Sequence, residues 1–123
     1  MKNQGLAHPY QESDMGVFSR LNYGAAPSRV LDFFIKNKDY TYTQSEISED
    51  TKLSNKTVSL AIKHLEERGL IKTDRKVGQA RLLKLNTESQ ATRLLIQAAF
   101  ELAKFENHKK IVENKREEVS VTQ

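Results

Sequence analysis

The sequence predicts an α+β, mainly α fold: one small helical domain with a β-hairpin, followed by a long C-terminal helix. Apolar residues recur at i, i+3, i+4 and i+7, the period of a helix that is buried on one side; they are Val58, Ala61, Ile62 and Leu65. The period changes after Gly69, where two short extended segments flank a turn predicted over residues 74–79. From Thr87 onward no Gly or Pro interrupts the chain, which favours a single long helix.

Length and composition limit the classes of protein to consider. A chain of 123 residues has room for one domain and an additional oligomerisation element. The absence of cysteine excludes disulfides and thiolate metal sites. No apolar run approaches the length of a membrane span, and the N-terminal residues lack the apolar core of a signal peptide. We therefore expect a soluble, cytoplasmic protein without membrane contacts.

The first third of the chain predicts an arm and a scaffold helix. Residues 1–26 contain three glycines and a proline and show no sustained period, which predicts a largely irregular N-terminal arm. A short packed segment over residues 15–23 is the alternative. Pro27 suits the first turn of a helix, and dense apolar residues predict a buried helix over Ser28–Lys38. The β-prone residues 40–42 are candidates for a third strand beside the hairpin.

Two helices joined by a polar turn follow the scaffold helix. The first is expected over Gln44–Asp50 with Ser45 as its cap. The second, over residues 55–68, begins where Ser54 or Asn55 can accept hydrogen bonds from free backbone N–H groups. It ends before Gly69, because glycine adopts a positive φ without a Cβ penalty.

The order helix, polar turn, helix and basic hairpin predicts a winged helix-turn-helix domain over residues 27–86. In such domains the second helix lies in the major groove of DNA, with residues near its N-terminus at the base edges. The hairpin, called the wing, is expected at residues 74–80, within reach of the minor groove or backbone phosphates.

The distribution of charge favours a polyanionic partner. Residues 51–86 hold nine Lys or Arg and three Asp or Glu, a net charge of +6, whereas the whole chain carries +4. The excess of positive charge is therefore confined to the predicted winged domain, as expected for a protein that displaces counterions from DNA. A solvated charged surface is the alternative interpretation.

The C-terminal region predicts a dimerisation helix over residues 87–116 and a frayed tail over residues 117–123. Thr87 and Gln90 fit a capping box at the start of the helix. Apolar residues at alternating spacings of 3 and 4 form a seam like that of a coiled coil, with Lys109 as its one polar member; the seam residues are Leu95, Ala98, Leu102, Phe105 and Val112. We expect the first half of this helix to touch the winged domain and the rest to pair with the same helix of a second copy of the chain. A long helix that folds back on its own domain is the alternative.

Three segments of this sequence carry a resemblance to a known family. They read PSRVLDFFIKN, SEISEDTKLSNKTVSLAIKHLEERGLIK and RKVGQARLLKLNTES. Over residues 26 to about 100, the chain resembles archaeal-type winged helix-turn-helix regulators of the broad MarR/TrmB kind. The resemblance implies a dimeric DNA-binding protein whose recognition helix and wing both contact DNA. Unlike larger members, the chain shows no appended sensor domain, so a small-molecule effector is not indicated.

The candidate DNA-binding residues lie on the second helix and on the wing. They are Ser54, Asn55, Lys56, Thr57, Ser59, Lys63, Arg75, Lys76, Gln79 and Arg81. Asn55 and Lys56 have side chains suited to adenine and guanine edges, whereas Lys63 is placed for the phosphate backbone. Asn55 as a pure helix cap, and the wing tip as a solvated turn, are the alternatives.

The sequence does not predict an enzyme. Its three histidines have no metal-binding spacing, and there is no Gly-rich phosphate loop, so we expect no catalytic residues, no metal and no cofactor. The predicted function is sequence-specific binding of double-stranded DNA by a homodimeric, nucleoid-associated transcription regulator that meets an inverted repeat. An architectural or plasmid/viral partition protein with low sequence preference, or a winged-helix protein-interaction module, are the alternatives.

Overall fold

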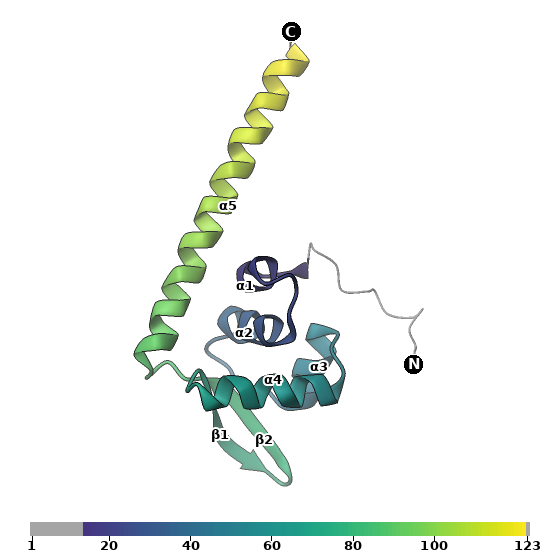
Figure 1. Ribbon diagram of the computed structural model, residues 1–123, viewed down its shortest axis with the longest axis vertical. Helices are drawn as coiled ribbons and strands as arrows, with labels where there is room; N and C mark the ends of the chain where they lie inside the picture. Colours follow the sequence, from purple (N-terminus) through teal and green to yellow (C-terminus); the bar gives the residue numbers. More distant parts are fainter. Residues whose placement is uncertain (1–13, 123) are drawn as a thin grey trace.

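The computed structural model describes residues 14–122, with side chains described over residues 14–115. The part of the predicted arm before residue 14 lies outside the described residues. Figure 1 shows a winged domain beside the first half of a long C-terminal helix, whose second half extends away from the domain. In chain order the elements are α1 (Val17–Leu21), α2 (Ala26–Lys36), α3 (Gln44–Thr51), α4 (Asn55–Glu67), β1 (Ile71–Val77), β2 (Ala80–Leu85) and α5 (Gln90–Thr122).

The core lies between α2, α3 and α4 and is closed by the base of the hairpin. Its largest fully buried apolar side chains come from all of these elements; they are Val30, Phe34, Ile47, Val58, Ile62, Leu83 and Leu85. Phe33 adds two edge-to-face ring contacts, with its centroid 5.5 Å from that of Phe34 and 4.8 Å from that of Tyr42. Aromatic pairs in this geometry stabilise a core beyond the area that they bury. The prediction of a winged helix fold is confirmed.

Helix α3 is capped by a different residue from the one predicted. Thr43 accepts a hydrogen bond on its side chain from the Glu46 N–H at 3.3 Å, while the Glu46 carboxylate accepts one from the Thr43 N–H at 2.8 Å. This reciprocal capping box satisfies two N–H groups that the first helical turn leaves free. Ser45 lies inside the helix, so its prediction as the cap is wrong.

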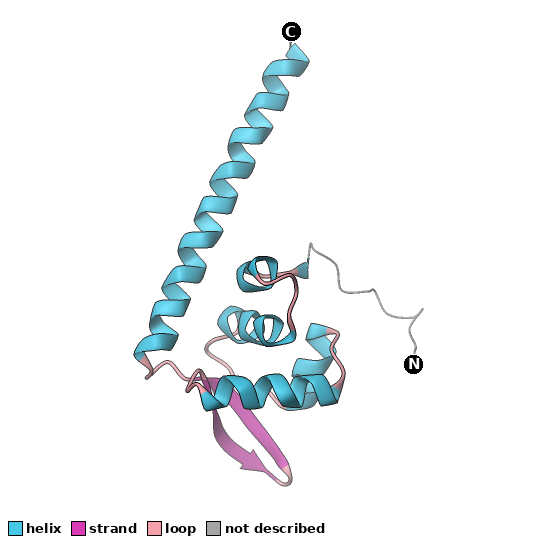
Figure 2. Cartoon of the chain, viewed as in Figure 1, coloured by secondary structure: helices cyan, strands magenta, loops and turns pink. Residues whose placement is uncertain are grey.

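The wing is longer than predicted, and its turn is shorter. Strands β1 and β2, magenta in Figure 2, pair in antiparallel orientation up to the last pair, Val77 with Ala80. Only Gly78 and Gln79 form the turn, and Gly78 has a φ of +61°, as the first position of a type II′ hairpin turn requires. Residues 74–77, predicted as turn, therefore belong to β1. The register shifts at Asp74, where a bulge admits one extra residue.

The predicted third strand is reduced to a single bridge. Tyr42 exchanges two backbone hydrogen bonds of 2.8 Å with Leu83, and its neighbours add no further pairing. One side of β2 is thereby held against the segment that leads into α3. This bridge fixes the wing relative to the helix-turn-helix.

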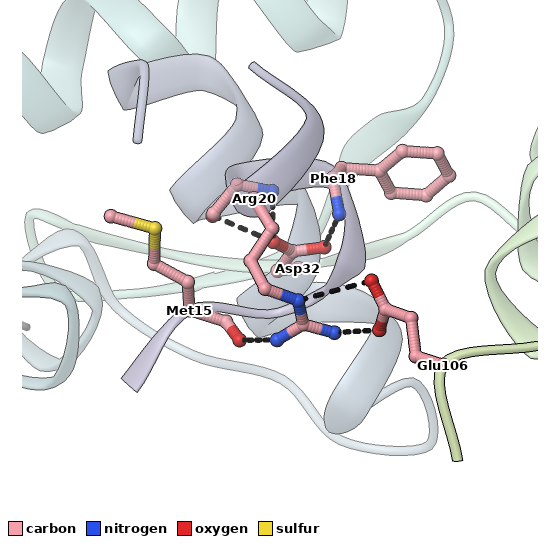
Figure 3. A network of polar contacts seen from close by, with 6 residues as sticks. Met15, Phe18, Arg20, Asp32 and Glu106 are labelled. Carbon is pink, nitrogen blue, oxygen red and sulfur yellow. Dashed lines mark hydrogen bonds and ion pairs between the residues drawn. The ribbon is translucent and has the colours of Figure 1, made fainter. Parts of the chain in front are cut away.

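Helix α1 lies in the segment predicted as a largely irregular arm, and its N-terminus is held by a carboxylate from α2. Asp32 accepts hydrogen bonds from the Phe18 N–H at 3.1 Å, the Ser19 N–H at 2.8 Å and the Ser19 hydroxyl at 2.6 Å (Figure 3). Phe18 and Ser19 are both buried. A five-residue helix is not stable by itself, so these tertiary contacts explain a helix that the local sequence did not predict.

Helix α5 begins three residues later than its predicted cap and continues past its predicted end. Residues 87–89 form a turn, and Ser89, not Thr87, accepts a hydrogen bond from the Thr92 N–H at 3.4 Å. At the other end the helix runs to Thr122, so the predicted end near residue 116 is too early. Residues 117–122 contain no Gly or Pro and include good helix formers, which allows this extension.

The first half of α5 packs on the winged domain. Leu95, Ile96 and Leu102 contact the core cluster, and Ala99 is itself buried. Arg20 of α1 forms a two-point ion pair with Glu106, with 3.2 Å between Nε and Oε2 (Figure 3). Within residues 14–122, no helix is both long and apolar enough to cross a membrane.

Candidate nucleic-acid interface

The two faces of α4 differ completely in character. Its four predicted apolar residues are buried in the core, each at most 3% exposed; they are Val58, Ala61, Ile62 and Leu65. The opposite face carries Lys56, Ser59, Leu60 and Lys63, all exposed. Among the side chains that the structure describes, Lys56 and Lys63 form no ion pair. Their charges are therefore available to a partner.

The hydrogen bonds at the start of α4 show whether Asn55 is the cap of this helix. Ser54 is the N-cap, because its hydroxyl accepts a hydrogen bond from the Thr57 N–H at 3.1 Å. The same hydroxyl donates to Thr57 Oγ1 at 2.9 Å, so both hydroxyl groups take part in the cap. Asn55 is the first helical residue, and its carbonyl accepts a hydrogen bond from the Gln44 side chain at 3.0 Å. The exposed Asn55 side chain is thus not used as the cap.

The four candidate residues of the wing fall into two groups. Lys76 and Gln79 are exposed at its tip, and Arg75 is exposed beside Asp74, to which its guanidinium donates at 3.1 Å. Arg81 is used within the protein: it donates to Glu66 of α4 at 2.7 Å and to Thr73 of β1 at 3.0 Å. Arg81 therefore joins the wing to α4 and sets their relative position.

The base of the wing is largely neutralised by acidic residues. Lys72 donates a hydrogen bond to Glu88 at 2.8 Å, and this hydrogen bond is the main cause of a lowered pKa of the Glu88 carboxyl group. The Lys84 Nζ lies 3.6 Å from the Asp74 Oδ1, so these two side chains form an ion pair. Among the side chains that the structure describes, Lys56 and Lys63 of α4 and Lys76 at the wing tip thus keep positive charges that no ion pair neutralises.

A groove connects these two positive regions. It lies between the start of α3, the start of α4 and the second strand; its lining residues are Thr43, Gln44, Ser45, Asn55, Gln79, Ala80, Arg81 and Leu83. Most of these side chains carry hydroxyl, amide or guanidinium donors. Three of the predicted residues, Asn55, Gln79 and Arg81, are brought together here from two elements. Among the described residues, no cluster of three His, Asp or Glu side chains could hold a metal ion.

The five predicted dimerisation residues do not share one environment. Leu95 and Leu102 pack against the core of their own domain, whereas Ala98 is exposed and Phe105 is 70% exposed. Val112 lies beyond the domain and is half-buried. Leu95 and Leu102 belong to the first half of α5, the half predicted to touch the winged domain. The pairing of the five residues with a second copy of the chain stays a prediction.

Comparison with known protein families gives a match over the helix-turn-helix. Residues 35–72, which contain α3, α4 and the start of β1, match the family described as winged helix-turn-helix DNA-binding. No curated protein matches the chain.

Three solved structures share the fold. A variant of Lactococcus lactis ZitR in apo form is 22% identical, with a TM-score of 0.60, over 78% of this chain and 73% of that one. NMB1585, a MarR family regulator from Neisseria meningitidis, is 21% identical with a TM-score of 0.52, over 85% and 84%. The Staphylococcus aureus MepR–DNA complex is 19% identical with a TM-score of 0.57, over 80% and 79%. The narrower resemblance to archaeal or TrmB-type regulators stays a prediction.

Leu60 is the residue of this surface that the sequence analysis left out of the DNA-binding set. Its side chain is 61% exposed between Lys56 and Lys63. Its spacing places Leu60 on the face opposite the stripe that starts at Val58, but an apolar side chain does not by itself suggest a contact with phosphate or a polar base edge.

Proposed function

We propose that the protein binds double-stranded DNA in a sequence-specific manner as a homodimer and regulates transcription. The observation that carries this proposal is the exposed face of α4 beside an exposed wing tip: Lys56 and Lys63 form no ion pair with any acidic side chain that the structure describes. The family match over residues 35–72 supports the same function, as does the fold shared with MepR, which was solved in complex with DNA. Such a protein resides with the DNA in the cytoplasm.

In the proposed complex α4 lies in the major groove, and the wing lies over the neighbouring minor groove or backbone. Asn55 and Lys56, in the first turn of α4, approach the base edges. Lys63, two turns further on, contacts phosphate and contributes affinity with little sequence information. Arg75 and Lys76 contact the narrow groove or its phosphates. Arg81 acts as a positioning residue, since it holds the wing against α4.

The second half of the proposal is that α5 pairs with α5 of another copy. Phe105 is 70% exposed and lies seven residues from Ala98, so both occupy nearly the same face of the helix. Leu94 and Val112 extend this stripe. A symmetric dimer would place two α4 helices about one helical turn of DNA apart, which predicts an inverted repeat as the target.

Selection from random duplexes, followed by fluorescence anisotropy, tests the DNA-binding half. We expect an enriched inverted repeat, binding that weakens steeply with salt, and weaker binding by Lys56→Ala and Arg75→Ala. Lys104→Ala on α5 is the matched control and should bind as the unmodified chain does. Tight binding without enrichment would instead indicate an architectural protein. Absence of binding at low salt would leave the winged domain as a protein-interaction module.

Analytical ultracentrifugation of two phenylalanine variants tests the dimer. Phe105→Ala should shift the equilibrium toward monomer. Phe100→Ala is a closely matched control, because Phe100 is 63% exposed on the same helix but lies about 140° around its axis from Phe105. Phe100 is also already in contact with Lys104, whose Nζ lies 5.5 Å from the ring centroid. A dimer that is unaffected by Phe105→Ala, or a monomeric unmodified chain, would contradict this half of the proposal.

A further inference from the structure

Leu60 occupies the middle of the basic face of α4. It lies four residues after Lys56 and three before Lys63, spacings that place all three side chains on one side of a helix. Leu60 is 61% exposed, whereas every other apolar residue of α4 is at most 3% exposed. The fold does not need this side chain, because the inward face of α4 is complete without it.

An exposed leucine between two cations is poorly suited to a phosphate or to a polar base edge. It has no hydrogen-bonding group, and its apolar surface remains in water in the free protein. In the major groove only one natural feature of the unmodified bases is apolar, the C5-methyl group of thymine. The flanking lysines supply the attraction to DNA, and Leu60 supplies the apolar contact surface.

We propose that Leu60 is a specificity-determining residue that recognises the C5-methyl group of a thymine in each half-site. This inference rests on the proposed function, since it requires α4 to enter the major groove. It adds an apolar contact with a base to a face on which Asn55 and Lys56 approach the polar base edges and Lys63 contacts phosphate. Leu60 then contributes the preference for thymine at one position.

Replacing thymine by deoxyuridine tests this assignment, because the exchange removes the methyl group and keeps every hydrogen-bonding group of the base. The binding site enriched by selection is synthesised with one thymine at a time replaced in both half-sites. Dissociation constants are measured by anisotropy for the unmodified chain, for Leu60→Ala and for Leu21→Ala. Leu21 is 63% exposed on α1, away from α4, and is therefore a matched control for the loss of an exposed leucine side chain.

For the unmodified chain and for Leu21→Ala, we expect one thymine position at which deoxyuridine weakens binding about fourfold per half-site, the effect of burying one methyl group. For Leu60→Ala the same exchange should have almost no effect. Leu60→Ala should remain folded by circular dichroism, because its side chain is mostly exposed. Exchange of cytosine for 5-methylcytosine in the same duplex shows whether a methyl group on cytosine is recognised instead.

Three results would overturn the assignment. Deoxyuridine could be neutral at every position, it could weaken binding equally in the presence and absence of Leu60, or only 5-methylcytosine could change the affinity. In each of these cases duplex binding persists, so the proposed function stands while the role of Leu60 falls. A chain that binds no duplex at all would overturn both, and the first anisotropy titration identifies that outcome.

Discussion

Helices α4 and α5 differ in how completely their apolar side chains are buried. In α4 every apolar residue except Leu60 is buried in the core. In α5 the residues that face the domain are covered, but large apolar side chains remain exposed on other sides; they are Leu94, Phe100, Phe105 and Ile111. Leu94, Phe100 and Phe105 belong to the first half of α5, whereas Ile111 belongs to the second half, which extends away from the winged domain (Figure 1).

The degree of burial within one chain therefore distinguishes apolar residues that stabilise the fold from apolar residues that are available to a partner. A helix whose apolar face is complete leaves its other face available for a polar partner such as DNA. A helix with exposed apolar residues is not fully covered by its own domain. Contiguous exposed apolar patches on soluble proteins commonly mark sites that bind a partner. Substitutions in the core, at α1, on the inward face of α5 and in the wing test this distinction.

The largest expected effect is that of Ile62→Ala. Ile62 is 1% exposed in the core, so its truncation leaves a cavity and should lower the free energy of unfolding by about 3 kcal/mol. At a protein concentration below the dissociation constant of the dimer, Phe105→Ala should change the free energy of unfolding by less than about 0.5 kcal/mol. Urea denaturation followed by circular dichroism gives both values. Similar losses for the two variants would remove the distinction between scaffold and interface.

Asp32→Ala should have the second largest effect. It removes the acceptor of three hydrogen bonds from α1 and leaves the buried Ser19 hydroxyl unpaired, which should cost about 2 kcal/mol. Helix α1 also holds α5 through Arg20 and Glu106, so the loss should loosen the joint between the two regions. Hydrogen exchange should accelerate at the amides of residues 18–20 and change little in α4. Uniform acceleration over the whole domain would contradict a local role.

Thr92→Val should stabilise the protein slightly. Thr92 is 1% exposed on the inward face of α5, and its hydroxyl has no hydrogen-bond partner among the described residues. An apolar group of the same shape removes this unsatisfied donor, with an expected gain of about 1 kcal/mol. Thermal denaturation measures the gain, and Thr87→Val in the exposed turn is the control. A loss of stability would show that the hydroxyl is satisfied in solution.

Arg81→Ala should have the smallest effect on stability and a larger one on DNA binding. The ion pair of Arg81 with Glu66 is partly exposed, so it should contribute no more than about 0.5 kcal/mol. Its loss frees the wing from α4, and the affinity for the selected duplex should fall even though the fold persists. Glu66→Gln is the diagnostic partner, because it breaks the same ion pair without removing a cation. Unchanged affinity for Glu66→Gln would mean that Arg81 does not act through wing position.

The sequence predicted the parts of the structure that depend on local periodicity. The stripe of α4, the order of the winged domain and the long last helix all follow from residue type and spacing, and each is present. Of the candidate residues on α4, Asn55, Lys56, Ser59 and Lys63 are exposed, whereas Thr57 is half-buried. Their contacts with DNA stay predictions.

The features that the sequence did not predict depend on contacts between distant residues. Helix α1 exists because Asp32, from another helix, holds its N-terminus. The use of Arg81 as a link to Glu66 depends on the register of the hairpin, which a bulge at Asp74 shifts. Neither of these is encoded in the spacing of neighbouring residues.

The salt dependence of duplex binding tests whether α4 is the DNA-binding surface. The logarithm of the dissociation constant is measured against the logarithm of the salt concentration for the unmodified chain, Lys56→Ala, Lys63→Ala and the control Lys104→Ala. If α4 neutralises phosphates, the slope should fall by about 0.9 for each phosphate-contacting lysine removed, twice that in a dimer, and stay unchanged in the control. Identical slopes for all four proteins would contradict the assignment of α4 as the DNA-binding surface.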